Sequence, residues 1–431
     1  MTLPPAAASL DDPFGGGLDP ACRLVQGDEV HDRAALLAQA DALAGRLGPA
    51  ARVAAVAASP LAVAVALLAA RRLDAELFLL RGAAAPAGVP SGVDALVGAD
   101  GAVTRLPDAA PPAVPGFALV LESSGTTGTP KRLRHDFRRL MARIQAGRGR
   151  GGVWLSTFDP GGYAGLQVLL TVLRGGGTLV AGPVLDVPAL ADLAVRHAVT
   201  HISATPSFWR AFLLTGGRPP LRALTLGGEV ADQPLLDRLA EAFPGAILRH
   251  IYASTEAGAL FAVVDGRAGF PAAWLDTGIE GTDLAIRDGI LQVRGPRLAL
   301  ALADGRALVG VDGWYPTGDR VEVVGDRVLF RGREDGMVNV GGVKVMPDAV
   351  EALMLGVPGV ADAAVRVRTS PITGHLLTAR LVPAPGFDQD AVRAAVVAAL
   401  ADLPPAARPR RLEFVSELEL SPSGKKKRVQ E

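Results

Sequence analysis

The stretch ESSGTTGTPKR, residues 122–132, concentrates hydroxyl groups, glycines and a lysine within a few positions. It follows the apolar run FALVL, residues 117–121, and precedes DFRRLMARIQA, which we predict to be helical. A strand–loop–helix unit of this kind can hold an anion with backbone N–H groups and hydroxyls. The glycine spacing, G-x-x-G-x-x-K from Gly125 to Lys131, does not fit the Walker A pattern. Alone, the stretch fits either a phosphate-binding loop or a solvated linker.

Further segments downstream carry side chains that can do chemistry. They are YASTE (252–256), TGD (317–319), GRED (332–335) and GKKKR (424–428). Together with SSGTTGTPK (123–131), this series resembles, in the same order, the motifs of the adenylate-forming superfamily. That superfamily includes acyl- and aryl-CoA synthetases, peptide-synthetase adenylation domains and firefly luciferase. The resemblance covers most of the chain, and it is nearest to o-succinylbenzoate–CoA ligases and aryl-CoA ligases.

The resemblance implies an AMP-forming acid–thiol ligase that uses ATP, Mg²⁺ and coenzyme A. A carboxylate would attack the α-phosphorus of ATP, giving an acyl-adenylate and pyrophosphate, and a thiol would then displace AMP. Both steps gather negative charge, so catalysis should depend on positioned hydrogen-bond donors, a lysine and a metal ion.

The resemblance also assigns residues to the nucleotide. Tyr252 would stack on adenine, and Gly228 and Glu229 in the turn LGGEV would line the adenine pocket. Asp319 would accept the ribose hydroxyls, and Arg333 would reach the ribose or a phosphate. The β- and γ-phosphates would be surrounded by Ser123, Ser124, Gly125, Thr126, Thr127, Gly128 and Lys131.

Three residues are expected to take part in the chemical step itself. Thr255 would hydrogen-bond the α-phosphate, and Glu256 would bind Mg²⁺, a hard cation that prefers carboxylate oxygen. Lys425 would bridge the acid and the α-phosphate during adenylation only. Without the resemblance, the run around Lys425 is equally typical of a basic tail.

The acid pocket departs from the family pattern. Many relatives have a histidine shortly before the Gly-Leu of GLQVL, but here that position falls on Gly162 or Tyr163. A tyrosine there can pack on a flat ring or donate to a hydroxyl, and Phe208 and Trp209 are expected nearby. We therefore expect an aromatic acid. The residues assigned to this pocket are Tyr163, Gly227 and Ala253.

The elements that position these residues follow from the apolar patterns. Short apolar strands and amphipathic helices alternate between residues 52 and 243, which is typical of an α/β fold with a parallel sheet. The Gly/Pro-rich segment 82–116 is expected to be a loop. Hairpin signals after Gly278 indicate a β-rich subdomain. We predict a large multi-layer N-terminal α/β domain over residues 1–331, with a shortened N-terminal part, and a small mobile C-terminal α/β domain over 332–431.

The resemblance gives the small domain two further roles. Asp335 falls on the hinge about which this domain turns between the two steps. Gly341 and Gly342 would lie against pantetheine, because glycine lets backbone approach a thin ligand closely.

Composition excludes some classes of function. The 44 basic and 44 acidic residues balance, so neither a nucleic-acid partner nor an acidic solvating tail is indicated. A single cysteine, Cys22, rules out an intrachain disulfide framework and fits a cytoplasmic protein. Residues 53–70 are apolar, but Ser-Pro in their middle favours a strand, a turn and a buried helix over a membrane span.

Two alternatives remain open at this stage. The acyl group could pass to the phosphopantetheine of a carrier protein, or to an amine or hydroxyl within the substrate. The chain could also be a degenerate adenylate-binding regulator. The absent histidine and Ala253, which replaces the glycine usual in the family, suggest this, whereas the retained Lys425, Glu256 and Asp319 argue against it.

Overall fold

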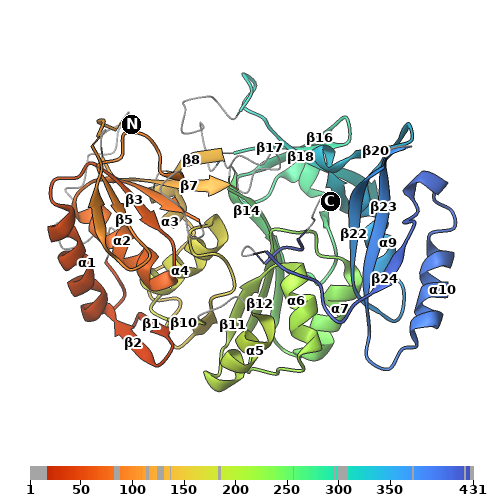
Figure 1. Ribbon diagram of the computed structural model, residues 1–431, viewed down its shortest axis with the longest axis horizontal. Coiled ribbons are helices and arrows are strands. Elements are labelled where there is room, and N and C mark those ends of the chain that lie inside the picture. Colours follow the sequence, from red (N-terminus) through yellow and green to blue (C-terminus); the bar gives the residue numbers. More distant parts are fainter. Residues whose placement is uncertain are drawn as a thin grey trace.

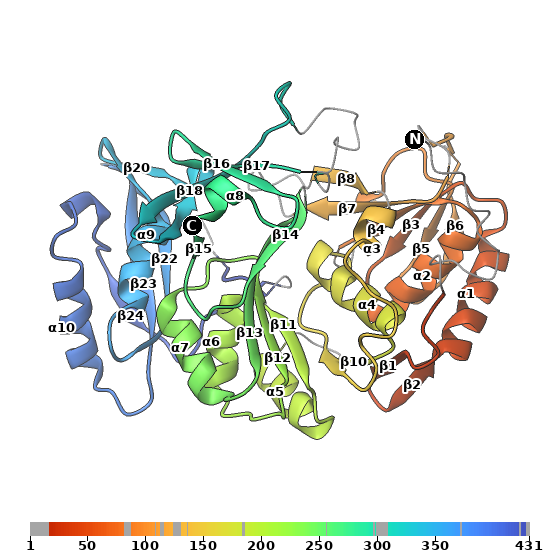
Figure 2. The same cartoon turned by 180° about the vertical axis from the view of Figure 1, so that it is seen from behind.

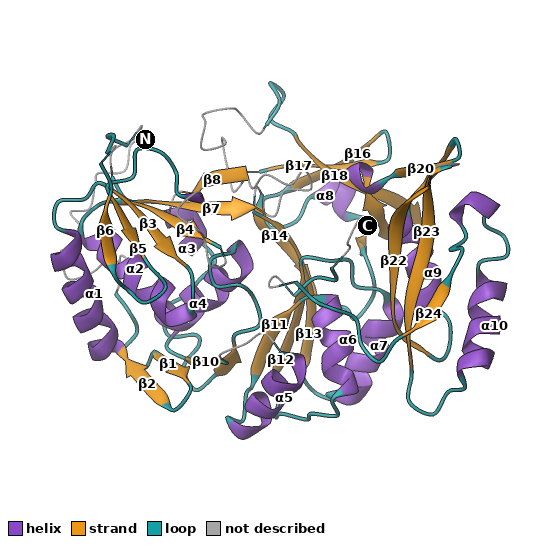
Figure 3. Ribbon diagram, viewed as in Figure 1, coloured by secondary structure: helices purple, strands orange, loops and turns teal. Residues whose placement is uncertain are grey.

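The computed structural model describes residues 17–81, 88–107, 109–112, 116–123, 131–135, 137–182, 186–255, 257–295, 298, 309–370, 373–421 and 424–427. Figure 1 shows an N-terminal sheet at the left, a larger sheet in the centre and a C-terminal region at the right. Figure 2 gives the same arrangement from behind, and Figure 3 separates the helices from the strands.

The N-terminal sheet is parallel at its centre and antiparallel at both edges. Its strands, in spatial order, are β6 (Val103–Arg105), β5 (Ala95–Val97), β3 (Arg52–Val56), β4 (Glu76–Leu80), β7 (Ala118–Ser123) and β8 (Lys131–His135). β5 and β6 lie inside the segment 82–116 that was expected to be a loop, so that expectation was wrong.

Two paired strands flank residues 124–130 of the opening motif, where a strand and a helix were expected. β8 pairs antiparallel with β7, with Ser123 opposite Lys131, and α3 (Phe137–Met141) follows. In β8, Leu133 and His135 are buried while Arg132 and Arg134 are partly exposed. This period of two is the burial pattern of a strand, and it accounts for the difference.

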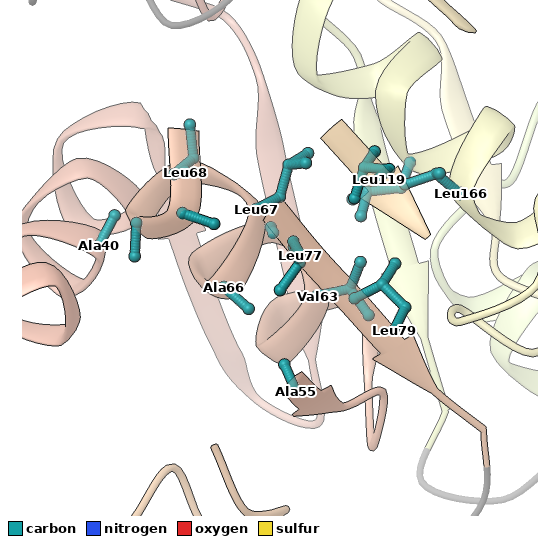
Figure 4. Close-up of a cluster of buried hydrophobic side chains, with 14 of the residues drawn as sticks. Ala40, Ala55, Val63, Ala66, Leu67, Leu68, Leu77, Leu79, Leu119 and Leu166 are labelled. Atoms are coloured by element: carbon teal, nitrogen blue, oxygen red, sulfur yellow. The ribbon is translucent and has the colours of Figure 1, made fainter. Parts of the chain in front are cut away.

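Helices cover the N-terminal sheet and form its core. α1 (Arg33–Leu47) begins at Asp32, whose side chain accepts from Ala35 N, and α2 (Pro60–Arg72) begins at Ser59, which caps Ala62 N. Figure 4 shows Val63, Ala66 and Leu67 of α2 near Leu77, Leu79 and Leu119 of the sheet, with Leu166 of α4 (Tyr163–Gly175) beside Leu119 in the same core. The expectation of a strand, turn and buried helix over residues 53–70 is confirmed by β3 and α2.

The large sheet is built mainly of parallel strands. Its order is β14 (Gly258–Val263), β13 (Ile247–Ser254), β12 (Ala223–Gly227), β11 (His201–Ala204), β9 (Val153–Leu155), β10 (Thr178–Ala181), β1 (Arg23–Gln26) and β2 (Glu29–Asp32). The edge strands β14 and β2 run antiparallel to their neighbours. Three helices pack on it through a common core: α5 (Val187–Arg196), α6 (Pro206–Leu214) and α7 (Gln233–Ala242). The predicted alternation of strand and helix in this segment is confirmed.

A β-rich region connects the large sheet to the C-terminal region. Its antiparallel sheet has the order β15 (Phe270–Pro271), β19 (Arg327–Arg333), β18 (Tyr315–Val324), β17 (Ile290–Arg294) and β16 (Asp283–Arg287), and α8 (Trp274–Thr277) lies beside it. The Asp288–Gly289 turn between β16 and β17 has positive φ at both residues, as a tight hairpin requires.

The C-terminal region has its own buried core. A hairpin of β20 (Val338–Val340) and β21 (Val343–Val345) precedes a sheet of β22 (Val360–Ser370), β23 (Gly374–Pro383) and β24 (Leu412–Phe414). Alternate residues of β22 face that core, which includes α9 (Pro347–Leu355) and α10 (Gln389–Ala399). The domain boundary between residues 331 and 332 stays a prediction.

None of the helices in the described part of the chain combines the length and the apolar character needed to cross a membrane.

Candidate functional site

The carboxyl ends of neighbouring parallel strands bring several polar groups to one edge of the large sheet. In open α/β sheets this edge is the usual place for a ligand. Thr157 follows β9, Thr205 follows β11, Gly228 follows β12 and Thr255 follows β13. The strands β9, β11, β12 and β13 are adjacent, so these residues, far apart in sequence, share one edge.

The C-terminal lysine reaches this edge from another part of the fold. A Cβ atom added at Gly228 would stand 3.5 Å from Cε of Lys425. The preceding residue is held as well, since the Thr205 hydroxyl donates to the Gly424 carbonyl. The structure thus brings together Lys425 and Gly228, which were predicted from sequence segments almost two hundred positions apart.

The start of α6 organises the same place. Thr205 is the N-cap residue, and its hydroxyl accepts from Phe208 N at 3.1 Å. The Glu229 carboxylate accepts from Ser207 N at 3.0 Å and from Ser207 Oγ at 2.6 Å. A carboxylate is stabilised at a helix N-terminus by the free N–H groups and the helix dipole. Glu229 therefore fixes the glycine turn against α6.

The predicted ribose and adenine residues also lie together. The Tyr252 hydroxyl donates to Asp319 Oδ2, and Arg333 Nη1 donates to Asp319 Oδ1 at 3.2 Å. Burial raises the pKa of Asp319, against the lowering effects of the Tyr252 hydrogen bond and of Arg333. The Tyr252 ring stacks on Phe261 and Phe330, with centroids 5.2 and 5.1 Å away. This cluster joins β13 of the large sheet to β18 and β19 of the β-rich region.

The three residues assigned to the acid pocket converge near the start of β14. The Tyr163 hydroxyl accepts from Ala259 N at 3.1 Å, and Ala259 is the strand partner of Ala253. Gly227 ends β12 and pairs with Ile251 two residues before Ala253. Their adjacency agrees with a common pocket.

Phe208 and Trp209 do not lie where they were expected. Their side chains belong to the core behind the large sheet, with 2% and 0% of their surface exposed. Trp209 Nε1 donates to Thr225 O at 3.1 Å. Because α6 is amphipathic and its buried face includes both rings, packing decides their position, and neither ring is available to line an open pocket.

A histidine that the sequence reasoning missed lies beside Tyr163. The His135 ring centroid is 6.0 Å from that of Tyr163, and His135 is 8% exposed. Its Nε2 is buried and has no hydrogen-bond partner among the described residues. Burial lowers the pKa of His135 to about 4, so its imidazole is neutral near pH 7. The strand pattern of KRLRH, with Leu133 and His135 on one face, was the signal that could have placed it here.

Two family models match the chain: the AMP-binding enzyme over residues 94–299 and the AMP-binding enzyme C-terminal domain over residues 349–425. The chain belongs to the AMP-binding enzyme family. The first match contains the Gly228 turn and Thr255, and the second ends at Lys425. The predicted family is therefore confirmed on the segments that build the site.

Known members of the AMP-binding enzyme family are similar to this chain. Salicylyl-CoA synthase / salicylate adenylyltransferase of a Streptomyces species is 29% identical over 351 residues, which is 73% of this chain and 63% of that protein. L-proline–[L-prolyl-carrier protein] ligase of Streptomyces coelicolor is 30% identical over 313 residues, 63% of this chain and 57% of that protein. The chain thus spans less than two thirds of the length of these relatives.

The fold is that of solved family members. The amide bond synthetase McbA from Marinactinospora thermotolerans matches with a TM-score of 0.69 and 22% identity, covering 95% of this chain and 96% of that one. The predicted α/β fold of the adenylate-forming superfamily is confirmed at this level.

Some residues expected from the AMP-binding enzyme family lie outside the described residues. They include Glu256 and the phosphate loop residues Ser124, Gly125, Thr126, Thr127 and Gly128. Ser123 and Lys131 are described through their backbones, which pair at the two ends of that loop. Within the described residues no group of three or more His, Cys, Asp or Glu side chains could hold a metal ion. The magnesium prediction rests on Glu256 and stays a prediction.

The residues that the family resemblance gave to the small domain have contacts of their own in the β-rich and C-terminal regions. Asp335 pairs with Arg333, with 3.0 Å between Oδ1 and Nε. Gly341 and Gly342 form the two-residue turn of the β20–β21 hairpin, with φ of 58° and 88°, and Gly341 N donates to Thr373 O. Positive φ at both residues explains why glycine stands at both positions. The hinge and pantetheine roles stay predictions.

Proposed function

We propose that the protein is an ATP-dependent ligase that activates an aromatic carboxylic acid as an acyl-adenylate and transfers the acyl group to the thiol of coenzyme A. The observation that carries this proposal is the position of Lys425 over the Gly228 turn, at the carboxyl edge of the large sheet. In a flexible basic tail, the residue before this lysine, Gly424, would not be held by the Thr205 hydroxyl.

The arrangement supports the first half-reaction in a simple way. A carboxylate oxygen of the acid attacks the α-phosphorus of ATP, a C–O–P link forms, and pyrophosphate leaves with the electron pair of the broken P–O bond. Negative charge concentrates between the acid and the α-phosphate, where the Lys425 ammonium stabilises it. Thr255, at the end of β13, would donate to the same phosphate, and Glu256 would hold Mg²⁺, which neutralises phosphate charge when bound.

The second half-reaction needs a thiol at the acyl carbon. The thiol sulfur bonds to that carbon, the C–O bond to the adenylate breaks, and AMP leaves. The thiol proton goes to solvent. Lys425 is not required for this step in the proposal, because bonds form and break at the acyl carbon and no longer at the α-phosphorus.

An aromatic acid is supported by two neighbouring rings at the proposed pocket, Tyr163 and His135. The Tyr163 hydroxyl, at the start of α4, accepts from the Ala259 amide, and the centroid of the neutral His135 ring is 6.0 Å from that of Tyr163. Offset or edge-to-face packing of a flat acid on such rings is worth about 1 kcal/mol beyond area burial. The similarity to a salicylyl-CoA synthase supports the same class of substrate.

The test is pyrophosphate release with Mg-ATP over a panel of aryl and alkyl acids, with and without coenzyme A, and with products read by mass. Lys425→Ala should slow release about 10²–10³-fold, because it removes one charge from the transition state. Lys427→Ala is the matched control: its side chain is exposed, and its Nζ is 3.6 Å from Glu419 Oε2 on the same hairpin. An acyl-CoA mass with an aryl acid would support the whole proposal.

A second candidate function differs in the acceptor. The similarity to a carrier-protein ligase and to an amide bond synthetase favours transfer to phosphopantetheine or to an amine. Pyrophosphate release without an acyl-CoA product would favour this candidate. If no acid gave release above the Lys425→Ala level while calorimetry detected ATP binding, adenylate formation would be refuted in favour of a nucleotide-binding regulator.

A further inference from the structure

Lys426, the residue after Lys425, lies in a buried cage of acidic groups. Its Nζ is 2.9 Å from Glu351 Oε1 of α9 and 2.8 Å from Asp362 Oδ1 of β22, and it also donates to the Ala363 carbonyl. The Lys426 side chain is 5% exposed, and the two carboxylates are 9% and 5% exposed. We call these three partners the Lys426 cage.

Both carboxylates of the cage also accept hydrogen bonds from backbone N–H groups, as buried charges require. Glu351 Oε2 accepts from Val365 N at 3.0 Å, and Asp362 Oδ1 accepts from Ala363 N at 2.9 Å. Burial alone would lower the pKa of Lys426, but Glu351 and Asp362 together raise it above the ordinary lysine value. The ammonium group therefore stays charged at neutral pH.

The cage anchors one face of a short hairpin whose other face carries Lys425. Lys427 N donates to Glu419 O at 2.9 Å, Ser421 N to Lys425 O at 2.7 Å and Gly424 N to Ser421 O at 2.8 Å. Leu420 and Lys426 form the β-bridge between these bonds. Successive side chains of an extended segment point to opposite sides. Lys426 thus points into the C-terminal region while Lys425 points at the Gly228 turn.

The cage also contacts the large sheet's helices. Arg210 of α6 is 3% exposed, forms an ion pair with Asp232 at the start of α7, and has its Nε 3.7 Å from Asp362 Oδ1. The same helix α6 begins at Thr205, which holds Gly424. Helix α6 therefore holds the hairpin through its N-cap residue Thr205 and contacts the cage through Arg210 near its middle.

We propose that Lys426 is a positioning residue for adenylation: it locks the hairpin 419–427 into the Lys426 cage and so holds Lys425 over the Gly228 turn. This inference rests on the proposed function, in which Lys425 stabilises the charge at the α-phosphate. Misplacing a catalytic group by about 1 Å can cost on the order of 10²-fold in rate.

The first experiment is a double-mutant cycle on the full chain, with the acid that gives the fastest pyrophosphate release. Lys426→Met keeps the length of the side chain and removes its charge. We expect the maximal rate of release to fall about 10²-fold while the KM for ATP changes less than about threefold. In the Lys425→Ala background the same substitution should have no further effect, because Lys426 acts through Lys425. An equal loss in both backgrounds would overturn the proposal.

Two further measurements distinguish a loss of Lys425 positioning from a loss of folding and from a failure of the proposed function. If Lys426→Met does not fold, Glu351→Gln takes its place. This variant keeps the hydrogen bond from Val365 N, removes one charge of the cage, and should also lower the rate of pyrophosphate release. Hydrogen exchange measured on the peptide 415–427 should be at least about tenfold faster in Lys426→Met, and unchanged in Lys427→Met.

The exchange result stands even if no acid is turned over. Wild-type exchange in Lys426→Met would overturn the positioning role. Absence of pyrophosphate release from the unmodified chain with every acid would instead refute the proposed function. Conversion of a synthetic aryl-adenylate and coenzyme A to acyl-CoA should proceed at the wild-type rate in Lys426→Met, and a matching loss there would also overturn the proposal.

Discussion

Two buried basic side chains, in the Lys426 cage and at the His135–Tyr163 contact, have opposite surroundings. Lys426 meets two carboxylates and a carbonyl, and its pKa is raised although it is buried. His135 has an Nε2 atom without a partner in the described part of the chain, and burial lowers its pKa to about 4. Burial alone lowers the pKa of a basic side chain, and carboxylate partners can reverse the sign of that shift. One region thus keeps a permanent charge that can anchor, and the other keeps a neutral ring that can face a substrate.

The largest effect is expected from removing Arg210, which contacts Asp362 of the Lys426 cage. Arg210→Met leaves Asp232 and Asp362 with less positive charge in a buried place, and losing one partner of a buried ion pair costs about 3–5 kcal/mol. Urea unfolding would measure this. Arg267→Met is the control, since its ion pair with Asp326 is exposed on both sides and its loss should change stability far less. Equal losses in the two variants would contradict the assignment of the cage as a buried network.

The next effect is the pH dependence of folding stability, which has opposite signs for His135 and Lys426. His135 is neutral when folded down to about pH 4, whereas an unfolded histidine takes up a proton near pH 6.5. The stability it contributes is present above pH 6.5 and is lost as the pH falls toward 4, by about 3 kcal/mol. Lys426 has a raised pKa, so its contribution is present below pH 10.5 and is lost as the pH rises through its folded value.

Thermal unfolding from pH 7 down to 4.5 tests the histidine half of that contrast. His135→Phe should flatten the acid loss of stability. Some dependence of the unfolding temperature on pH should remain because of His201, whose pKa burial also lowers to about 4. An unchanged slope in His135→Phe would show that the folded imidazole is protonated.

A smaller effect is expected at the turn that faces Lys425. Gly228 has φ of +80°, and Gly245 has φ of +83° with open space where a Cβ would stand. An alanine at either position costs about 1–2 kcal/mol for the left-handed backbone. Gly228→Ala should in addition slow pyrophosphate release, because its Cβ would contact Cε of Lys425, while Gly245→Ala should not. An equal loss of pyrophosphate release in Gly228→Ala and Gly245→Ala would mean that backbone strain alone slows the reaction.

The smallest effect belongs to the tyrosine beside His135. Tyr163→Phe removes the acceptor for Ala259 N and should cost about 1 kcal/mol of stability. We expect the KM for the acid to rise a few-fold with little change in the KM for ATP. A change in the KM for ATP that matched the change for the acid would argue against Tyr163 as a residue of the acid pocket.

The sequence predicted those parts of the fold where a local period and a turn signal agree. The strand and helix of residues 52–72 and the Asp288–Gly289 hairpin are examples, because their patterns do not depend on distant partners. Lys425, Gly228 and Asp319 were singled out through the motif order. Their spatial arrangement needed the structure, since it depends on which strands pair.

The failures have a common physical origin. Phe208 and Trp209 were misplaced because an apolar run does not say which face of a helix meets the core. β8 was not predicted because Lys-Arg-Leu-Arg-His has no strong β-propensity, and its pairing with β7 makes it a strand. Lys426 looked like part of a basic tail because its acidic partners come from α9 and β22, more than sixty residues earlier.

The edge of the large sheet has a practical consequence for shortening this chain. β1 lies between β10 and β2, and β2 presents Glu29, His31 and Asp32 at the rim, which discourages further strand pairing. Removing residues up to 32 would expose the backbone of β10, an apolar TLVA strand, along its whole length. Such a chain should associate with copies of itself through that strand, so truncations meant for crystallisation should stop before Arg23.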